Sequence, residues 1–519
     1  MSWSKAETKF SLRTGDRFSV LFFLRTKNTM LNSKNIPKEV SRVTSTLETA
    51  GFEAYLVGGC VRDLLLARTP RDWDITTNAN PEEILNLFEH TFYENSFGTV
   101  GIVSDETSDE TLKNIEVTPY RLEGAYSDSR HPDEVVFSDK LEDDLKRRDF
   151  TVNAMAYNVS HETLVDLYKG QEDLNNKIIK TVGNPDDRFK EDALRILRAV
   201  RFTTELNFNI ESETQKSIIK FAEKLENISK ERIRDEFVKI ILSENPMNGI
   251  ILSQKLGLLK YIIPELEMGI DSKQKGAHIY TIWEHNLRAL QHSADKDMPL
   301  HLRLSALLHD IAKPHTKRFD KVKKENTFYG HDVVGERVSR ETLERLKFSG
   351  KILEVVPKLV RNHLFFSDID QITMSAVRRI IASVGPENVW DLMKLRTCDR
   401  IGMGRPKEKP YRLRKYMAMV EEAMKDPVSV KMLKINGNRI MEIINEKPGP
   451  KIGLILNALM EEILDNPKLN TEEYLESKTL ELIKLSESDL KLLSQKGEEK
   501  KDVLEEKELK EIRDKHNVK

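Results

Sequence analysis

Two aspartates separated by a single residue, Asp72 and Asp74, have the spacing of a metal site on a strand. In a strand both side chains point to the same face, where the two carboxylates can hold Mg²⁺. Upstream, Gly58 and Gly59 lie between a short apolar run and a helical segment, which predicts a strand-to-helix turn. Glycines there let backbone N–H groups approach a triphosphate, and Arg62 adds positive charge. Together these residues indicate metal-dependent nucleotidyl transfer.

Glu116 supplies a third carboxylate, in another strand-like run that covers residues 115–121. It can complete a carboxylate cluster for two-metal phosphoryl chemistry, either by binding metal or by assisting the attack. An isolated Asp-x-Asp pair more often caps a turn or lies on a solvated strand, so the neighbouring motifs decide between these interpretations.

The stretch from Gly58 to Thr77 resembles the head domain of the class II CCA tRNA nucleotidyltransferases, which belong with the bacterial poly(A) polymerases to the polymerase-beta-like superfamily. The resemblance implies that Asp72 and Asp74 bind the catalytic Mg²⁺ ions. It also implies an α+β protein, in which an N-terminal head with a mixed sheet precedes an all-helical neck, an HD-type body and a C-terminal helical tail.

The segment 142–155 resembles a second motif of this family, which holds the ribose and phosphates of the nucleotide. Arg148 can pair with phosphate, and Asp149 can accept a hydrogen bond from a ribose hydroxyl, which would favour ribonucleotides. The resemblance also places Asn153 among the nucleotide-binding residues. Taken alone, the segment favours a surface charge run before a buried stretch.

Asp192, Arg195 and Arg198 follow one another at three-residue steps, beside an apolar stripe at helical spacing. An ordinary ion pair on an amphipathic helix also explains this pattern. In the family that the chain resembles, the matching Asp and Arg read the incoming base. A carboxylate accepts from an exocyclic amino group and a guanidinium donates to a ring nitrogen or carbonyl, which selects cytosine and adenine. Arg198 and Arg201 are then phosphate- or base-positioning groups.

A second group of histidines and aspartates lies farther along the chain, each in a helix or at a helix edge. Its members are His285, His309, Asp310, His331, His363 and Asp399. A single histidine is more often a structural residue than a ligand, but the ordered series resembles an HD phosphohydrolase domain. The resemblance implies one or two divalent metals held by imidazoles and carboxylate. Two functions are compatible with this resemblance: phosphoester hydrolysis, and RNA binding by a helical domain without hydrolysis.

The composition of this 519-residue chain limits which kinds of partner it can bind. Its 83 basic and 85 acidic residues nearly cancel, so RNA contacts must come from local patches. Cys60 and Cys398 are the only cysteines, which argues against a disulfide framework and favours a reducing cytoplasm. No apolar run approaches the roughly 20 residues that span a bilayer, so no membrane partner is expected.

Residues 1–35 are rich in Arg and Lys and poor in acids. They predict a disordered basic extension, and a flexible arm or a stretch ahead of a start at Met30 is favoured over an organelle transit segment. The remaining boundaries follow from pattern and resemblance. They are 36–175 for the nucleotidyltransferase head, 176–265 for a helical neck with the base-reading helix, 266–420 for an HD-like domain, 421–485 for a helical RNA-binding tail and 486–519 for a charged, solvated tail.

Two glycine-containing turns, 433–438 and 447–453, lie in the predicted RNA-binding tail. Such turns can present backbone amides to a nucleic-acid phosphate, or they can simply connect helices. Both interpretations stay open.

These features predict an enzyme that adds C, C and A stepwise to the 3′ end of tRNA from CTP and ATP. The segment 121–140 is similar to the flexible loop of relatives that add the final A. An A-adding enzyme or a poly(A) polymerase of the same family is the nearest alternative. An HD metal-dependent phosphohydrolase with an RNA-binding head is the alternative from another class.

Overall fold

The computed structural model describes residues 31, 33–93, 98–104, 107–123, 135–274, 279–322, 324–365, 372–424 and 433–518. The chain divides into two compact units, Met1–Ile228 and Ser229–Lys519. This division falls inside the predicted neck. The predicted basic extension lies almost entirely outside the described residues, and so does the part 124–134 of the predicted loop.

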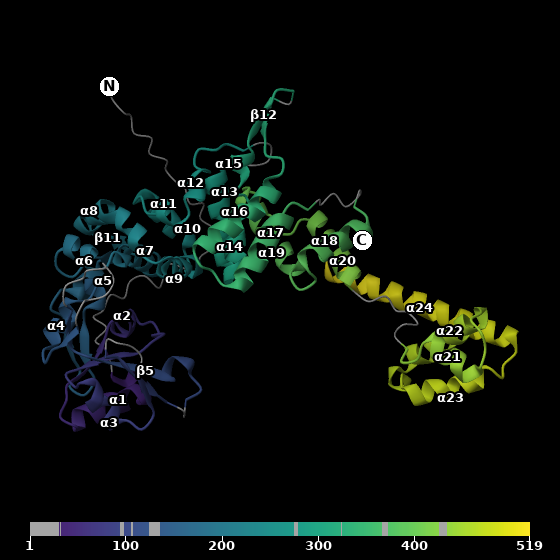
Figure 1. The fold of residues 1–519 in the computed structure, drawn as a ribbon, viewed down its shortest axis with the longest axis horizontal. Helices are drawn as coiled ribbons and strands as arrows, with labels where there is room; N and C mark the ends of the chain where they lie inside the picture. The colour runs from purple at the N-terminus through teal and green to yellow at the C-terminus, as the bar shows by residue number, and fades with distance from the viewer. Residues whose placement is uncertain are drawn as a thin grey trace, which may run out of the picture. The chain divides into compact units, whose positions relative to one another are not determined.

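Among the described residues of the first unit, seven strands form one mixed sheet in the order β3-β4-β5-β2-β1-β8-β9 (Figure 1). The strands β2 and β5 are parallel, and the other neighbours are antiparallel. The strands are β1 (Ala54–Val57), β2 (Asp74–Thr77), β3 (Thr91–Tyr93), β4 (Val100–Val103), β5 (Asn114–Pro119), β8 (Ala156–Asn158) and β9 (Thr163–Val165).

The central strands bury one face of this sheet. In β2, Ile75, Thr76 and Thr77 are all fully buried, while in β5 the buried Ile115 and Val117 alternate with the partly exposed Glu116 and Thr118. This alternation is the pattern of a sheet that packs on one side. Val43 and Leu47 of one helix and Ile84 of another belong to the same core. The first-unit helices are α1 (Lys38–Thr49), α2 (Gly59–Leu65), α3 (Pro81–Leu87), α4 (Leu141–Lys146), α5 (Gly170–Asn175), α6 (Pro185–Glu191), α7 (Leu194–Leu206) and α8 (Ser212–Phe221).

Two short strand pairs complete the first unit as far as it is described. They are β6 (Arg121–Glu123) with β7 (Val135–Phe137), and β10 (Ile178–Ile179) with β11 (Asn209–Ile210). The second pair lies beyond residue 175, where the sequence pattern predicted helices almost throughout.

The second unit is mainly helical. Its first part consists of α9 (Lys230–Leu242), α10 (Pro246–Lys255), α11 (Leu259–Ile262), α12 (Pro264–Glu267), α13 (Ile282–Asp295), α14 (Leu300–Leu308), α15 (Lys313–Thr316), α16 (His331–Arg345), α17 (Gly350–Asn362), α18 (Met374–Val384), α19 (Val389–Gly402) and α20 (Tyr411–Met424). A hairpin of β12 (Arg318–Asp320) and β13 (Glu325–Thr327) interrupts the helices, and the sequence pattern did not predict it.

Four helices, α21 (Gly437–Ile444), α22 (Pro450–Asp465), α23 (Glu472–Leu482) and α24 (Glu487–Lys515), share a small core near the C-terminal end. The predicted solvated tail 486–519 corresponds to α24. One face of this helix is buried rather than solvated, because Leu490 and Ile512 are each less than a twentieth exposed. Gly497 lies so close to α22 that an added Cβ would stand 2.3 Å from the Asn457 carbonyl oxygen.

The mixed sheet of the first unit and the helices of the second confirm the α+β class. Within the part of the chain that the structure describes, no helix is both long enough and apolar enough to cross a membrane.

Candidate functional site

Asp74 and Glu116 are direct neighbours across the parallel strand pair β2–β5. Both side chains are half-buried, whereas Trp73 and Ile75 on either side of Asp74 are buried. Register partners in adjacent strands present their side chains on the same face of the sheet. The structure therefore brings together two of the three predicted carboxylates.

Asp72 lies in a bend before β2 and is exposed. The prediction that a strand carries both aspartates is wrong for this residue, because β2 begins only at Asp74. The backbone bond from the Glu116 N–H to the Trp73 carbonyl, at 3.1 Å, extends the pairing by one residue and stops short of Asp72.

The Gly58–Gly59 turn lies directly beside Asp74 of β2. Gly58 has φ of 75°, a conformation that side chains disfavour, and it stands at the start of α2. A Cβ on Gly58 would lie 3.1 Å from Nη1 of Arg148 and 3.3 Å from Oδ2 of Asp74. Gly59 follows as the first residue of α2, with an added Cβ 3.6 Å from Nη2 of Arg62. The turn thus adjoins one carboxylate and two guanidinium groups.

A buried carboxylate that the sequence analysis missed orients Arg148. Asp144 of α4 is fully buried, and its Oδ2 accepts from Nη2 of Arg148 at 2.8 Å. Its other oxygen pairs with Arg147. Burial raises the pKa of Asp144, but the two guanidinium groups outweigh it and the pKa lies below its usual value. The segment is therefore not a surface charge run, and the i, i+3 and i, i+4 spacing from Asp144 was the available signal.

Asp149 joins the second motif to α7. Its Oδ2 accepts from Nε of Arg198 at 2.7 Å, while Oδ1 accepts from the Phe150 N–H at 2.8 Å and from Nδ2 of Asn153 at 3.3 Å. The amide oxygen of Asn153 accepts in turn from Nη1 of Arg62 at 2.8 Å. Burial raises the pKa of Asp149, but Arg198 outweighs it and lowers that pKa to about 2.

Phe202 of α7 gathers three of the predicted nucleotide-binding arginines, a role that the sequence analysis did not give it. Its ring centroid lies 5.3 Å from Cζ of Arg62, 5.3 Å from Cζ of Arg198 and 4.2 Å from Cζ of Arg201. The ring also meets Phe150 edge-on, with centroids 5.8 Å apart. Cation–π contacts of this kind position guanidinium groups while leaving their N–H donors available.

Asp192 and Arg195 do not share a helix. The structure ends α6 at Glu191, places Asp192 in extended backbone and begins α7 at Leu194. The prediction of one helical face for Asp192, Arg195 and Arg198 is wrong for Asp192, whose Oδ1 accepts from the Leu194 N–H at 2.9 Å. Arg195 pairs instead with Glu191, at 2.6 Å.

Replacing Arg198 by Met should destabilise the first unit. The groups around Asp149, Arg198 foremost, hold its folded pKa at about 2, below the usual 3.8. This difference corresponds to about 2 kcal/mol of stability, fully present above pH 4 and lost as the pH falls toward 2. Urea unfolding of the wild type and Arg198→Met should differ equally at pH 7 and pH 5, and less below pH 4. A Lys216→Met control removes an exposed pair with Glu213 and should change little. A difference that grows between pH 7 and pH 5 would contradict the assignment.

The six predicted HD residues form one buried cluster in the second unit. Nε2 of His285 lies 2.8 Å from Nε2 of His309, 3.1 Å from Oδ2 of Asp310 and 3.4 Å from Oδ1 of Asp399. On its other side, Oδ1 of Asp310 lies 3.2 Å from Nε2 of His331 and 3.4 Å from Nε2 of His363. Asp310 is thus shared by two groups of metal-ligating atoms.

The imidazole tautomers suit metal binding. Nδ1 of His309, His331 and His363 each donates to a backbone carbonyl three residues earlier, at 2.8, 2.7 and 2.6 Å. Each ring therefore directs the Nε2 lone pair into the cluster. Oδ1 of Asp310 and Nε2 of His331 and His363 are buried without a hydrogen-bond partner among the described residues. A divalent cation would satisfy all three atoms, so the residues fit a metal site.

Two cations beside this cluster were not predicted. Nζ of Lys313 lies 2.5 Å from Oδ2 of Asp310, and Arg396 pairs with Asp399. Burial raises the pKa of Asp310, but Lys313 and His309 outweigh it and hold the pKa well below its usual value. The i, i+3 spacing of each pair was the signal in the sequence.

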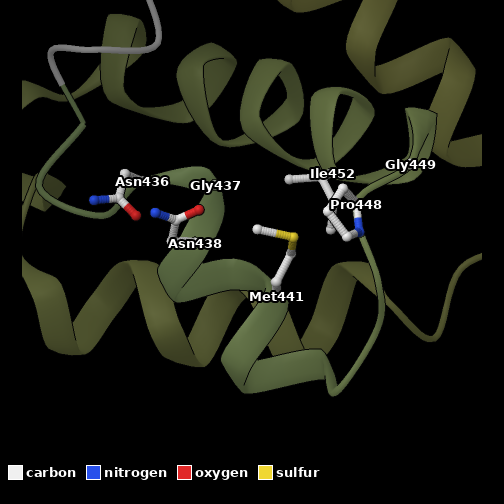
Figure 2. Close-up of a pocket in the computed structure, with 7 residues that line it drawn as sticks. All are labelled: Asn436, Gly437, Asn438, Met441, Pro448, Gly449 and Ile452. Atoms are coloured by element: carbon white, nitrogen blue, oxygen red, sulfur yellow. The ribbon is translucent and has the colours of Figure 1, made fainter.

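The C-terminal helices line an open hollow of about 410 Å³ between the two predicted glycine turns. Figure 2 shows Met441 across from Pro448 and Ile452, with Asn438 on the same side as Asn436. Asn436 caps α21, since its side chain accepts from the Arg439 N–H at 3.0 Å.

Three family models match successive parts of the chain. "Poly A polymerase head domain" matches residues 54–180, "Probable RNA and SrmB- binding site of polymerase A" matches 207–269, and "HD domain" matches 282–401. A curated CCA-adding enzyme of Enterococcus faecalis is 31% identical over 441 residues, which cover 84% of this chain and 94% of that protein. The chain belongs to the CCA-adding enzyme family.

Other CCA-adding enzymes agree with this membership. That of Lactobacillus helveticus is 52% identical over 199 residues, 38% of this chain, and the match spans only about half (48%) of that relative's length. The crystal structure of the Bacillus stearothermophilus CCA-adding enzyme in complex with CTP matches with a TM-score of 0.56 at 25% identity, covering 86% of this chain and 98% of that one. The family resemblance of the head and of the HD region is therefore confirmed.

Proposed function

We propose that this protein adds C, C and A stepwise to the 3′ end of tRNA, using CTP and ATP. The observation that carries the proposal is the register of Asp74 with Glu116 beside Gly58 and Arg148. This register supports the proposal because two carboxylates next to a glycine turn and a guanidinium group are what nucleotidyl transfer needs. Family membership supports the same conclusion.

Different residues of the head would bind the metal ions and the phosphates. Asp74, Asp72 and Glu116 are the groups that would hold Mg²⁺, which activates the tRNA 3′ hydroxyl and stabilises the departing pyrophosphate when bound. The 3′ oxygen attacks the α-phosphate of the nucleotide, and the bond to the pyrophosphate breaks. Arg148 and Arg62 bind the phosphates beside the Gly58–Gly59 turn.

The α7 region selects and orients the nucleotide. Asp149 accepts from the ribose hydroxyl, and Asn153 holds Arg62 in place. Asp192 and Arg195 read the base edge shared by cytosine and adenine. For Arg195 this means that its guanidinium, which donates to Glu191 and to the carbonyls of Arg188 and Arg147, turns part of these donors to the base. Arg198 and Arg201 complete the site around Phe202.

In the second unit, the two ligand groups that share Asp310 would hold two divalent metals. His285, His309 and Asp399 serve one metal, and His331 with His363 serves the other. A bound pair of divalent ions can polarise a phosphoester for hydrolysis. We assign the C-terminal helices up to residue 485 to RNA binding, and the two free, buried cysteines fit a reducing cytoplasm.

The test is an extension assay with a tRNA that lacks its 3′ CCA, Mg²⁺ and CTP, ATP or both, resolved to single nucleotides. We expect growth by three residues only when both nucleotides are present. A long ATP ladder would instead identify a poly(A) polymerase, and extension only of a tRNA ending in CC would identify an A-adding enzyme. Without any extension, the phosphohydrolase alternative would replace the proposal.

A further inference from the structure

The β12–β13 hairpin leaves the helical body directly at the HD cluster. It connects α15 with α16, and in Figure 1 it projects away from the helices that surround it. Both of its ends are tied to the cluster. Lys313, at the start of α15, contacts Asp310, and Nδ1 of His331 donates to the Phe328 carbonyl at 2.7 Å. The base of the hairpin therefore adjoins the metal ligands, and the rest of the hairpin extends outward from them.

The hairpin and its flanks carry a concentration of exposed cations. They are Lys317, Arg318, Lys321 and Lys324, and none of them has an ion pair among the described residues. Two carboxylates, Asp320 and Glu325, stand opposite each other in the register of the two strands. Cations therefore outnumber acids on this element, although the whole chain is nearly neutral. Local excess positive charge is what a nucleic-acid backbone requires of a protein surface.

Large apolar side chains stand exposed among these cations. Phe319 is 63% exposed, Tyr329 72% and Val322 92%. Aromatic rings that alternate with cations are the pattern of single-strand binding, because unpaired bases stack on the rings while the cations contact phosphates. A paired duplex does not offer its base faces. An acidic peptide would satisfy the cations and would leave the flat rings unused.

We propose that the β12–β13 hairpin with its flanking residues, 317–322 and 324–329, is an arm that binds single-stranded RNA and holds it near the HD cluster. The proposal rests on the proposed function in one respect, the choice of RNA over other polyanions. It gives the second unit its substrate class, a phosphoester at or near an unpaired RNA segment. The arm would position that segment near the HD cluster, where a divalent metal held by these residues would supply the hydrolytic chemistry.

Charge reversal at two arm positions tests this assignment. Binding of a short fluorescent single-stranded RNA to the full chain is measured by anisotropy over a range of KCl concentrations. Lys317→Glu with Lys321→Glu should weaken binding roughly tenfold or more at low salt and flatten the salt dependence by roughly 0.7 per lost phosphate contact. The matched control reverses Lys255 and Lys351, which are exposed in the same unit but outside the arm, and should leave the slope unchanged.

Phe319 provides an independent readout. Phe319→Ala should weaken binding roughly tenfold without altering the salt slope, and Phe319→Trp should restore it, because stacking does not depend on counterion release. Wild-type affinity and slope in both arm variants would overturn the proposal, and so would an arm that prefers an acidic peptide to RNA. Addition of CCA by the head at saturating tRNA is measured in parallel. If the wild type failed to add CCA but still bound RNA through the arm, the proposed function would be wrong and the proposal for the arm would stand.

Discussion

Asp74→Asn is expected to abolish incorporation of both CTP and ATP, by roughly a thousandfold or more. The substitution removes a negative charge from the β2–β5 carboxylate pair, and metal stabilisation of a phosphoryl transition state is worth several kcal/mol. Single-turnover extension of a tRNA that lacks CCA measures the effect. Asp72→Asn is expected to act in the same direction.

The control for Asp74→Asn is Glu89→Gln, which neutralises an exposed carboxylate elsewhere in the head. It should extend tRNA at the wild-type rate. Binding of tRNA should survive in all three variants, because the carboxylates do not attract a polyanion. If Asp74→Asn extended tRNA normally, Asp74 would be a strand residue without a catalytic role.

Asp310→Asn is expected to remove metal from the HD cluster entirely. Asp310 is the one residue common to both ligand groups, so its neutralisation weakens both sites at once. An affinity loss of roughly a hundredfold or more follows, since even an outer-shell partner of a metal ligand is worth 10- to 100-fold. Metal content after incubation with Mn²⁺ and gel filtration, measured by mass spectrometry, is the direct readout.

His363→Ala should lose the metal of the group that His363 belongs to and keep the metal of the other group. Asp310→Asn should lose both metals, and this contrast tests whether Asp310 is shared. Glu354→Gln, an exposed carboxylate on the same helix α17, should keep the wild-type metal content. Extension of tRNA by the head should be unchanged in all of these variants. Full metal retention by Asp310→Asn would show that Asp310 is not the shared ligand, and a wild type without bound metal would show that the cluster is a structural polar core.

Much of the head site was predictable because its signals are local. A strand, a glycine turn and a helix follow one another within residues 54–65, and the structure has them in that order. Glu116 was predicted from strand propensity alone, and only the parallel pairing of β2 with β5 shows that it is the direct neighbour of Asp74. Pairing between strands distant in sequence has no signature in either strand.

The errors at Asp72 and Asp192 have the same physical origin. Both residues flank a regular element, where period and propensity fix the boundary least well. At Asp192 the chain breaks between α6 and α7, so a three-residue step that looked helical crosses two elements. The contact of Arg62 with Phe202 was missed because it depends on packing between separate segments, whereas the pair of Asp144 with Arg148 had a local signal in its i, i+4 spacing that was overlooked.

The low pKa of Asp149 has a consequence for sugar-modified nucleotides. A carboxyl group with a pKa of about 2 carries no proton at neutral pH, so it can accept a hydrogen bond and cannot donate one. A ribose hydroxyl meets that requirement. A 2′-fluoro or 2′-O-methyl group offers only an acceptor at the 2′ position, where its partial negative charge would face a fixed anion, while the 3′ hydroxyl can still donate. If Asp149 faces the 2′ hydroxyl, CTP and ATP analogues of these two kinds should be poorer substrates than CTP and ATP themselves.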